Sequence, residues 1–223
     1  MKERNPGAIG YFDRKIDKFD NIYRQDGSRL GDWLNRTLRA SVVERFKLTF
    51  EELPKMENMS VLDVGCGTGR YMFEAANRGA SRIVGLDAAA GAIDAARIMA
   101  SELGVEERVQ FHQADFIDFQ LSRHFDVVFA MGYFDYILNP ESHLKKMLEI
   151  CDGTLIASFP KFWHPMTPIR KIRLALNRCP VRFYSMPRIR NLLRTVACDN
   201  YQIKSVSRDF ILIVRREEVL RSK

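Results

Sequence analysis

The residues best suited to ligand chemistry form one short segment. The run VLDV at 61–64 is apolar apart from one acid, and GCGTG at 65–69 follows it directly. Glycines let a backbone turn sharply and let a ligand approach main-chain N–H groups without interference from Cβ. Asp87 ends the next apolar run, 18 residues after Gly69, and a carboxylate there can accept hydrogen bonds from both hydroxyls of a ribose. The spacing predicts a site for a nucleoside-containing cofactor.

The sequence around this segment alternates between strand and helix patterns. Apolar runs predict strands at 61–64, 82–87, 108–115, 125–131 and 154–159. Helical periodicity predicts helices at about 70–78, 90–103 and 140–150. Strands separated by helices of this length form a parallel sheet with helices on both faces. Near the end, the runs YQIKSVS and DFILIVRR follow each other with no helix between them, which predicts an antiparallel hairpin.

The first 55 residues are expected to form a helical cap. Apolar residues recur at helical spacing within 12–23 and again within 34–53, where Pro54 ends the pattern. Such stripes need a partner surface, and the carboxyl edge of the sheet is the open one. We therefore expect a cap or lid at 1–55 and a main domain at 56–223, with a basic insertion at about 160–187.

The positive charge is concentrated in one part of the chain. Between Asp152 and Asp199 there are nine basic residues and no acidic one, whereas the rest holds 26 basic and 28 acidic residues. This distribution indicates an anionic substrate, a nucleic acid or a membrane surface as partner, and a merely solvated face is the alternative. Within the stretch, Ile169, Ile172 and Leu176 predict a helix whose apolar seam packs inward.

Four motifs in order resemble those of the class I S-adenosylmethionine-dependent methyltransferases. They are VLDVGCGTGR, VGLDAA, QADF and FDVVFAMGYFDYI, and the resemblance covers about residues 58–160. It implies a Rossmann-like α/β fold with a seven-stranded, mostly parallel sheet that ends in the antiparallel hairpin. It also implies S-adenosylmethionine as methyl donor and S-adenosylhomocysteine as product. The whole chain looks most like small-molecule enzymes of the magnesium-protoporphyrin O-methyltransferase and quinone methyltransferase type.

The same resemblance implies roles at the cofactor. The glycine turn would receive the methionyl part, with Asp63 orienting it, and Asp87 would bind the ribose. Asp115 would accept from the exocyclic amine of adenine, and the strand end within the fourth motif, around Ala130 to Tyr133, would face the reactive methyl. The residues implied to bind the cofactor are Asp63, Gly65, Cys66, Gly67, Gly69, Asp87, Ala88, Asp115, Phe116, Ala130 and Met131.

The acceptor side offers several candidates. Three side chains could act as a general base if the acceptor is protonated, namely Tyr136, Asp135 and His164. His143, in the helix after the fourth motif, is expected to be exposed. Residues that could contact the acceptor are Tyr11, Tyr23, Tyr133, Trp163, Arg170 and Arg173. We expect methylation at oxygen of a small, anionic or amphipathic metabolite.

Other readings of the glycine turn fit less well. A nicotinamide-dependent dehydrogenase needs GxGxxG, whereas the third glycine here comes one residue early, and a second dinucleotide-binding half is missing. A Walker P-loop is excluded because GK[ST] does not follow the turn. An RNA methyltransferase that uses the basic stretch at 161–194 for phosphate contacts remains the alternative. A cofactor-binding protein without catalysis is a third reading.

Composition places the chain among globular proteins. Hydrophobic residues make up 46% and charged residues 28%, and no apolar run reaches the roughly 18 residues of a membrane span. The N-terminus lacks the apolar region of a secretory signal. Four widely spaced cysteines without a CxxC pair argue against zinc and against a disulfide framework. We expect a cytoplasmic enzyme without a metal or a transmembrane segment, and its oligomeric state stays open.

Overall fold

The computed structural model describes residues 41–165, 167–176, 179 and 181–216 of the 223-residue chain, without the side chains of residues 169, 170 and 173. Most of the expected cap, including Tyr11 and Tyr23, therefore lies outside the described residues. The same holds for the side chains of Arg170 and Arg173.

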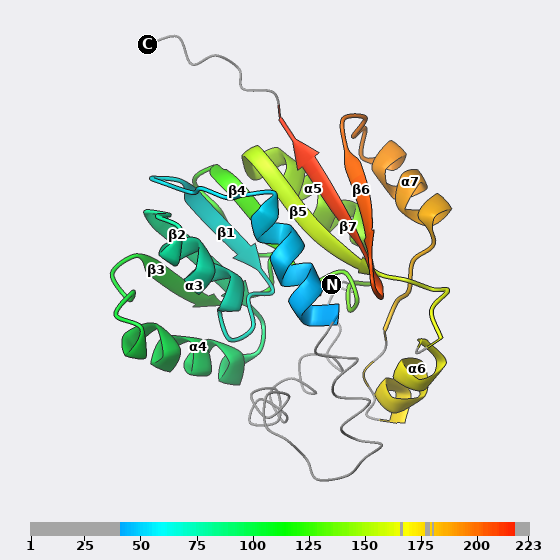
Figure 1. Ribbon diagram of the computed structural model, residues 1–223, viewed down its shortest axis with the longest axis horizontal. Helices are drawn as coiled ribbons and strands as arrows, with labels where there is room; N and C mark the ends of the chain where they lie inside the picture. Colours follow the sequence, from blue (N-terminus) through cyan, green and yellow to red (C-terminus); the bar gives the residue numbers. More distant parts are fainter. Residues whose placement is uncertain (1–40, 166, 177–178, 180, 217–223) are drawn as a thin grey trace.

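One seven-stranded sheet runs through the molecule in the order β3-β2-β1-β4-β5-β7-β6 (Figure 1). The strands are β1 (Ser60–Val64), β2 (Arg82–Asp87), β3 (Val109–Gln113), β4 (Phe125–Ala130), β5 (Cys151–Pro160), β6 (Gln202–Val206) and β7 (Asp209–Arg215). Strands β1 to β5 pair in parallel, while β7 is antiparallel to both β5 and β6. The predicted Rossmann-like sheet with a terminal hairpin is confirmed. Its order reverses between β1 and β4, and open α/β sheets bind ligands outside the carboxyl ends at such a point.

Helices cover both faces of the sheet (Figure 1). A helix at 41–51, α3 (Arg70–Asn77) and α4 (Ala90–Glu102) pack on one face with the apolar side chains of β1 and β2. On the other face lie α5 (Pro140–Ile150) and α7 (Met186–Thr195). The sixth helix, α6 (Thr167–Leu176), lies beyond the carboxyl end of β5.

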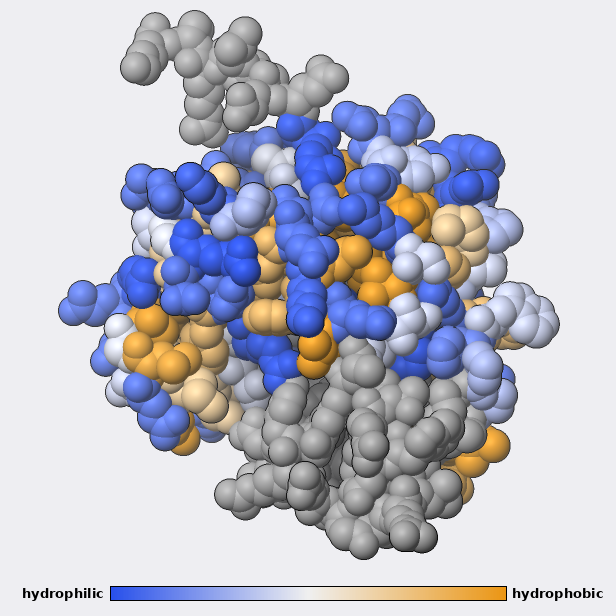
Figure 2. Space-filling model, in the orientation of Figure 1, coloured by the Kyte–Doolittle hydropathy of each residue, from blue (hydrophilic) through white to orange (hydrophobic). Residues whose placement is uncertain are grey.

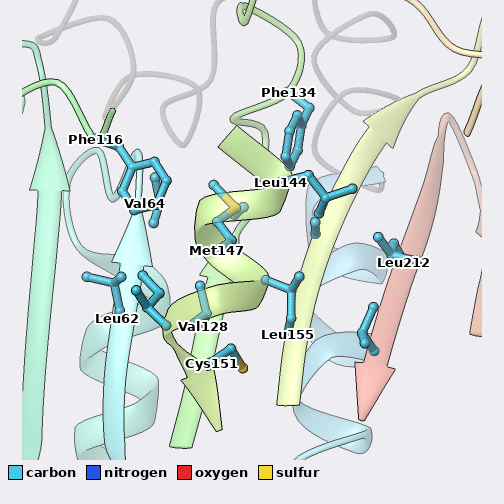
Figure 3. Close-up of a cluster of buried hydrophobic side chains, with 14 of the residues drawn as sticks. Leu62, Val64, Phe116, Val128, Phe134, Leu144, Met147, Cys151, Leu155 and Leu212 are labelled. Atoms are coloured by element: carbon cyan, nitrogen blue, oxygen red, sulfur yellow. The ribbon is translucent and has the colours of Figure 1, made fainter. Parts of the chain in front are cut away.

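The core between α5 and the sheet ends directly beneath the candidate site. Figure 3 shows side chains of the strands meeting those of α5, and Phe116 and Phe134 close the cluster at the carboxyl end. Fully burying a side chain of this kind contributes about 1.5–3 kcal/mol, so this layer fixes the strand ends relative to one another. The strand and helix residues labelled there are Leu62, Val64, Val128, Cys151, Leu155, Leu212, Leu144 and Met147.

The helix at 41–51 is fixed to the terminal hairpin at two points. Within the helix, Arg45 Nη1 lies 3.6 Å from Asp209 Oδ2, at the beginning of β7. Just beyond its end, the carboxylate of Glu52 pairs with Lys204 and Arg215 of the hairpin. Ion pairs therefore hold this helix against β6 and β7.

Helix α6 turns a different side inward from the one that its sequence predicts. Leu174 is 2% exposed and packs against Cys179, whereas Ile172 and Leu176 are 62% and 81% exposed. The predicted inward seam is therefore wrong for Ile172 and Leu176. The inward contact of α6 is made by Leu174, which packs against Cys179 and the partly buried side chains of Tyr136 and Val181.

Candidate cofactor and acceptor site

The glycine turn after β1 is held against the end of β2. The amides of Gly65 and Cys66 both donate to the carbonyl of Leu86, at 2.7 and 3.0 Å. Gly65 has a φ of 72°, which is the left-handed region that glycine tolerates best. A Cβ at Gly65 would also lie 2.7 Å from Cδ2 of Tyr133. The turn thus brings bare backbone close to the end of β4.

Asp87 ends β2 with both carboxylate oxygens directed at backbone amides. Oδ2 accepts from Gly67 N and Oδ1 from Ala89 N, each at 2.9 Å. These bonds fix the carboxylate beside the glycine turn. A carboxylate oxygen can accept more than one hydrogen bond, so amide bonds of this kind are compatible with a carboxylate that also binds ribose hydroxyls. Ala88 lies half-buried between the two anchoring points.

Asp63 is a buried acid at the base of the turn. Its side chain is 1% exposed, and Oδ2 accepts no hydrogen bond from any residue that the structure describes. Burial, with a further contribution from the charge of Asp87, raises the pKa of Asp63 to about 8. Because an unpartnered buried carboxylate is costly, this oxygen fits a ligand that brings a cation to it.

The segment after β3 closes the other side of the turn. Ala114 N donates to the carbonyl of Asp87 at 2.9 Å, and Ile117 N donates to Oδ1 of Asp115 at 3.3 Å. Phe116 is 2% exposed, beneath the surface of the site. The motif QADF therefore lies directly beside the end of β2, and its role at an adenine stays a prediction.

Lys146 holds this segment in place, a role that its sequence does not reveal. From α5 its Nζ donates to the carbonyls of Phe116, Ile117 and Phe119, at 2.7, 3.0 and 2.7 Å. The ammonium also lies 4.8 Å from the centroid of the Phe116 ring. Burial lowers the pKa of Lys146, and the charges of Asp118 and Asp115 oppose that effect.

Replacing Lys146 with methionine should lower the free energy of unfolding by about 1–3 kcal/mol, because three hydrogen bonds are lost while the stem contacts remain. Amide hydrogen exchange over residues 115–119 should become faster. Chemical denaturation and exchange mass spectrometry measure the two effects. Lys145→Met, at the exposed neighbouring position, is the matched control and should change stability by less than about 0.5 kcal/mol. Equal losses in both variants would contradict the role of Lys146.

The end of β4 forms the opposite wall of the site. Ala130 and Met131 are 0% and 8% exposed, and Gly132 N donates to Oγ of Ser158 at 2.7 Å. Tyr133 follows, with its phenol oxygen 2.7 Å from Nδ1 of a histidine on α5. The predicted strand end therefore carries a side chain that is fixed by a second polar group.

That histidine is His143, and the expectation that it is exposed is wrong. It is 1% exposed, and its ring lies 6.1 Å from the ring of Phe116. His143, Met147 and Ile150 recur at four and three, so helical periodicity would have placed His143 on the buried face of α5. The sequence thus contained the signal for this residue.

The remaining base candidates lie in different surroundings. Asp135 is 3% exposed, and its backbone carbonyl accepts from Arg182 N at 2.8 Å. Tyr136 is half-buried and packs with Leu174 beneath α6. For His164, partial burial and then the charges of Arg208 and Lys161 lower the pKa, so its imidazole is neutral at pH 7.

The loop after β5 presents its aromatic residues to solvent. Trp163 is 83% exposed and Phe162 is 48% exposed, and their rings meet with centroids 5.0 Å apart. Trp163 therefore stands on the outer side of this loop. In the described part of the chain, no group of three or more His, Cys, Asp or Glu side chains is arranged to hold a metal ion. No helix within the same residues has the length and apolar character to cross a membrane.

Comparison with known proteins identifies several proteins that are similar to this chain. A family model described as a methyltransferase domain matches residues 55–165. Ubiquinone biosynthesis O-methyltransferase of Maricaulis maris is 30% identical over 127 residues, which are 57% of this chain and 47% of that protein. tRNA U34 carboxymethyltransferase of Actinobacillus pleuropneumoniae is 28% identical over 95 residues, which are 43% of this chain and 30% of that protein. The chain thus matches less than half of the length of each relative.

A solved structure resembles the fold over nearly its whole length. Magnesium protoporphyrin IX methyltransferase of Synechocystis, with bound S-adenosylhomocysteine, matches with a TM-score of 0.74 at 19% identity. The match covers 94% of this chain and 97% of that chain. At this identity the likeness shows the shared fold.

Proposed function

The chain belongs to the class I S-adenosylmethionine-dependent methyltransferases, and on that premise we propose that it methylates a small, anionic or amphipathic acceptor at oxygen. The observation that carries the cofactor part is the buried carboxylate of Asp63 with its unpartnered oxygen beside the glycine turn. The ammonium group of the cofactor's methionyl part would form an ion pair with that carboxylate. The anchored Asp87 supplies two acceptors for ribose hydroxyls on the same edge of the sheet.

The residues present fit the parts of S-adenosylmethionine in order. Asp63 would hold the ammonium, Asp87 the ribose and Asp115 the exocyclic amine, with Phe116 beneath the adenine. When bound, the cofactor supplies a methyl group activated by its sulfonium. The work left to the chain is to align the acceptor with that methyl, and alignment can supply about 7–11 kcal/mol of the barrier.

Tyr133 is the side chain that we assign to the acceptor side of the site. It follows β4, touches the space above Gly65 and is oriented by His143. A general base would add about 10²–10⁴ in rate if the acceptor hydroxyl must lose a proton. The His143–Tyr133 pair joins Asp135, Tyr136 and His164 as a candidate for that step. The similarity to a ubiquinone biosynthesis O-methyltransferase supports oxygen as the methylated atom.

Replacing His143 with phenylalanine should lower kcat by about 10–100-fold while the affinity for S-adenosylhomocysteine stays within about threefold. Phenylalanine retains the ring packing against Phe116 but cannot bond the Tyr133 phenol. Tyr133→Phe should cause a similar loss, and the double variant should be no slower than either single variant, since the two residues act as one unit. Initial rates with a labelled methyl donor measure this. If the losses of the two single variants add in the double variant, His143 and Tyr133 act independently and the proposed pair is refuted.

A second function is favoured by two observations. The relatives include tRNA U34 carboxymethyltransferases, and nine basic residues without an acid lie between Asp152 and Asp199. An RNA acceptor would use those side chains for phosphate contacts, with binding that weakens steeply as salt rises.

The deciding experiment supplies labelled methyl donor together with either small phenolic and carboxylate acceptors or tRNA. Label in a small phenol or acid supports the first proposal, and label in tRNA replaces it with the second. Loss of tRNA binding at moderate salt without any label transfer would leave the small-molecule proposal in place.

A further inference from the structure

The turn that follows β4 is buried although it belongs to no strand or helix. Phe134 and Asp135 are 0% and 3% exposed, and Phe134 closes the core cluster of Figure 3. Figure 2 shows hydrophilic residues over much of one face of the molecule, where water can satisfy their polar groups. A buried turn has no such supply of water, so its carbonyl oxygens need donors within the chain.

This turn consists of residues 133–136 and begins with Tyr133. Tyr136 N donates to the carbonyl of Tyr133 at 3.2 Å, which closes the turn. The phenol oxygen of Tyr133 lies 2.7 Å from Nδ1 of His143. The place of this phenol therefore depends both on its partner on α5 and on the position of the turn that carries it.

One distant segment supplies donors for both central carbonyls of the turn. The hydroxyl of Tyr184 donates to the carbonyl of Phe134 at 3.1 Å, and Arg182 N donates to the carbonyl of Asp135 at 2.8 Å. Phe134 and Tyr184 are separated by 50 residues in the chain. Residues 182–184 therefore hold the middle of the turn through contacts that no local pattern contains.

Residues 182–184 are themselves fixed to the end of β5. Tyr184 N donates to the carbonyl of Pro160 at 2.7 Å, and Phe162 N donates to the carbonyl of Tyr184 at 2.8 Å. Lys161 and Tyr184 form a parallel bridge between these two bonds. The support of the turn is thus tied to the sheet.

The ring of Tyr184 is packed on several sides. It meets the ring of Phe159 edge-on with centroids 4.9 Å apart, and Phe159 stacks on Phe134 at 4.6 Å. The guanidinium carbon of Arg188 lies 5.0 Å from the centroid of the Tyr184 ring. Tyr184 is 1% exposed, and burial raises the pKa of its hydroxyl, so this group stays protonated and donates at neutral pH.

We propose that Tyr184 is a positioning residue for the acceptor side of the site. Its hydroxyl holds the turn at Phe134, and the turn holds Tyr133 where that side chain meets both Gly65 and His143. A shift of the turn by about 1 Å would misplace the phenol, and errors of this size can cost about 100-fold in rate. The role of Tyr133 toward an acceptor rests on the proposed function, whereas the effect of Tyr184 on Tyr133 does not.

The Tyr184→Phe variant tests this proposal by removing a single oxygen atom while the ring packing remains. The ring nitrogens of His143 are followed by NMR in the ligand-free full chain with nitrogen-labelled histidine, and His143→Phe identifies their signals. In the parent chain, the bond to the Tyr133 phenol should fix one tautomer and keep the two signals apart. In Tyr184→Phe the two signals should move toward each other, because the displaced phenol no longer fixes the tautomer.

Tyr201→Phe is the matched control. Tyr201 is half-buried and packs against the same core, and it lies just before β6, outside the turn and its support. This variant loses the same oxygen atom but should leave the His143 signals where the parent has them. Thermal melts should show that both variants are folded.

The methyl transfer rate gives a second measurement. With the acceptor that takes up label, Tyr184→Phe should lower kcat by about tenfold or more, while the affinity for S-adenosylhomocysteine stays within about threefold. In a Tyr133→Phe background, the same change should lower kcat by less than about threefold, because Tyr184 acts through Tyr133.

Three results would overturn the proposal: unchanged His143 signals in a folded Tyr184→Phe variant, equal changes in Tyr201→Phe, or a full further loss of kcat in the Tyr133→Phe background. The NMR measurement needs neither cofactor nor acceptor. A chain in which the His143 signals respond as expected but no acceptor takes up label would therefore retain the positioning of Tyr133 and lose the proposed function.

Discussion

The Asp87→Ala variant should bind S-adenosylhomocysteine at least about 100-fold more weakly than the parent chain. Two charge-assisted hydrogen bonds to the ribose would be lost, and each contributes about 1.5–3 kcal/mol. The variant also releases the amides of Gly67 and Ala89, which Asp87 holds at 2.9 Å in the present structure. The glycine turn then loses its fixed relation to β2.

Isothermal titration measures this loss, and a thermal melt shows whether the variant is folded. Asp94→Ala is the matched control, because Asp94 is an exposed acid on α4 whose side chain contacts Arg97. It should bind as the parent does. A folded Asp87→Ala variant with unchanged affinity would refute the assignment of the ribose site.

The affinity for S-adenosylhomocysteine should rise with pH by up to tenfold per unit between about pH 6 and pH 8. The reason is Asp63, whose pKa is raised to about 8 by burial and by the charge of Asp87. Below that pH the free protein carries a proton on Asp63. Binding of an ammonium requires the carboxylate, so the proton must leave as the ligand enters.

The same raised pKa determines how the free energy of unfolding of the ligand-free protein changes with pH. A carboxyl group with a raised pKa in the folded state favours folding when it is protonated. Its contribution is lost as the pH rises from the ordinary value of an aspartate toward the folded value of about 8. The ligand-free protein should therefore lose stability over the range in which its affinity for the ligand grows.

Titrations in buffers of different ionisation enthalpy measure the proton that is released. Asp63→Asn has the same size but cannot ionise, so its binding should be weak and independent of pH over this range. If the parent chain binds with the same affinity at both ends of the range and releases no proton, Asp63 does not hold the ammonium.

Those features of the site that depend on neighbours in sequence could be predicted. The glycine turn needs a preceding apolar strand and a following helix, and residues 61–78 contain all three in order. Asp87 ends the next strand, and parallel pairing of β1 and β2 necessarily brings it beside the turn. The terminal hairpin followed from two strand patterns without a helix between them.

Features that depend on contacts between residues far apart in the chain could not be predicted from the sequence. Lys146 reads as a solvated lysine of a helix, because its three carbonyl acceptors lie 27 to 30 residues earlier in the chain. On α6, the predicted seam includes Ile172 and Leu176, whereas Leu174 is the side chain that packs inward, against Cys179 and the distant Tyr136. Tyr136 lies 38 residues before Leu174, so local periodicity does not contain this contact.

The place of β7 in the sheet has a consequence for synthesis. It lies between β5 and β6, and its residues Ile211, Leu212 and Ile213 are at most 1% exposed. Until residues 209–215 leave the ribosome, β5 remains an uncovered edge with apolar side chains on both faces. Such an edge can pair with the wrong strand, so the nascent chain is most prone to aggregate just before its last strand emerges.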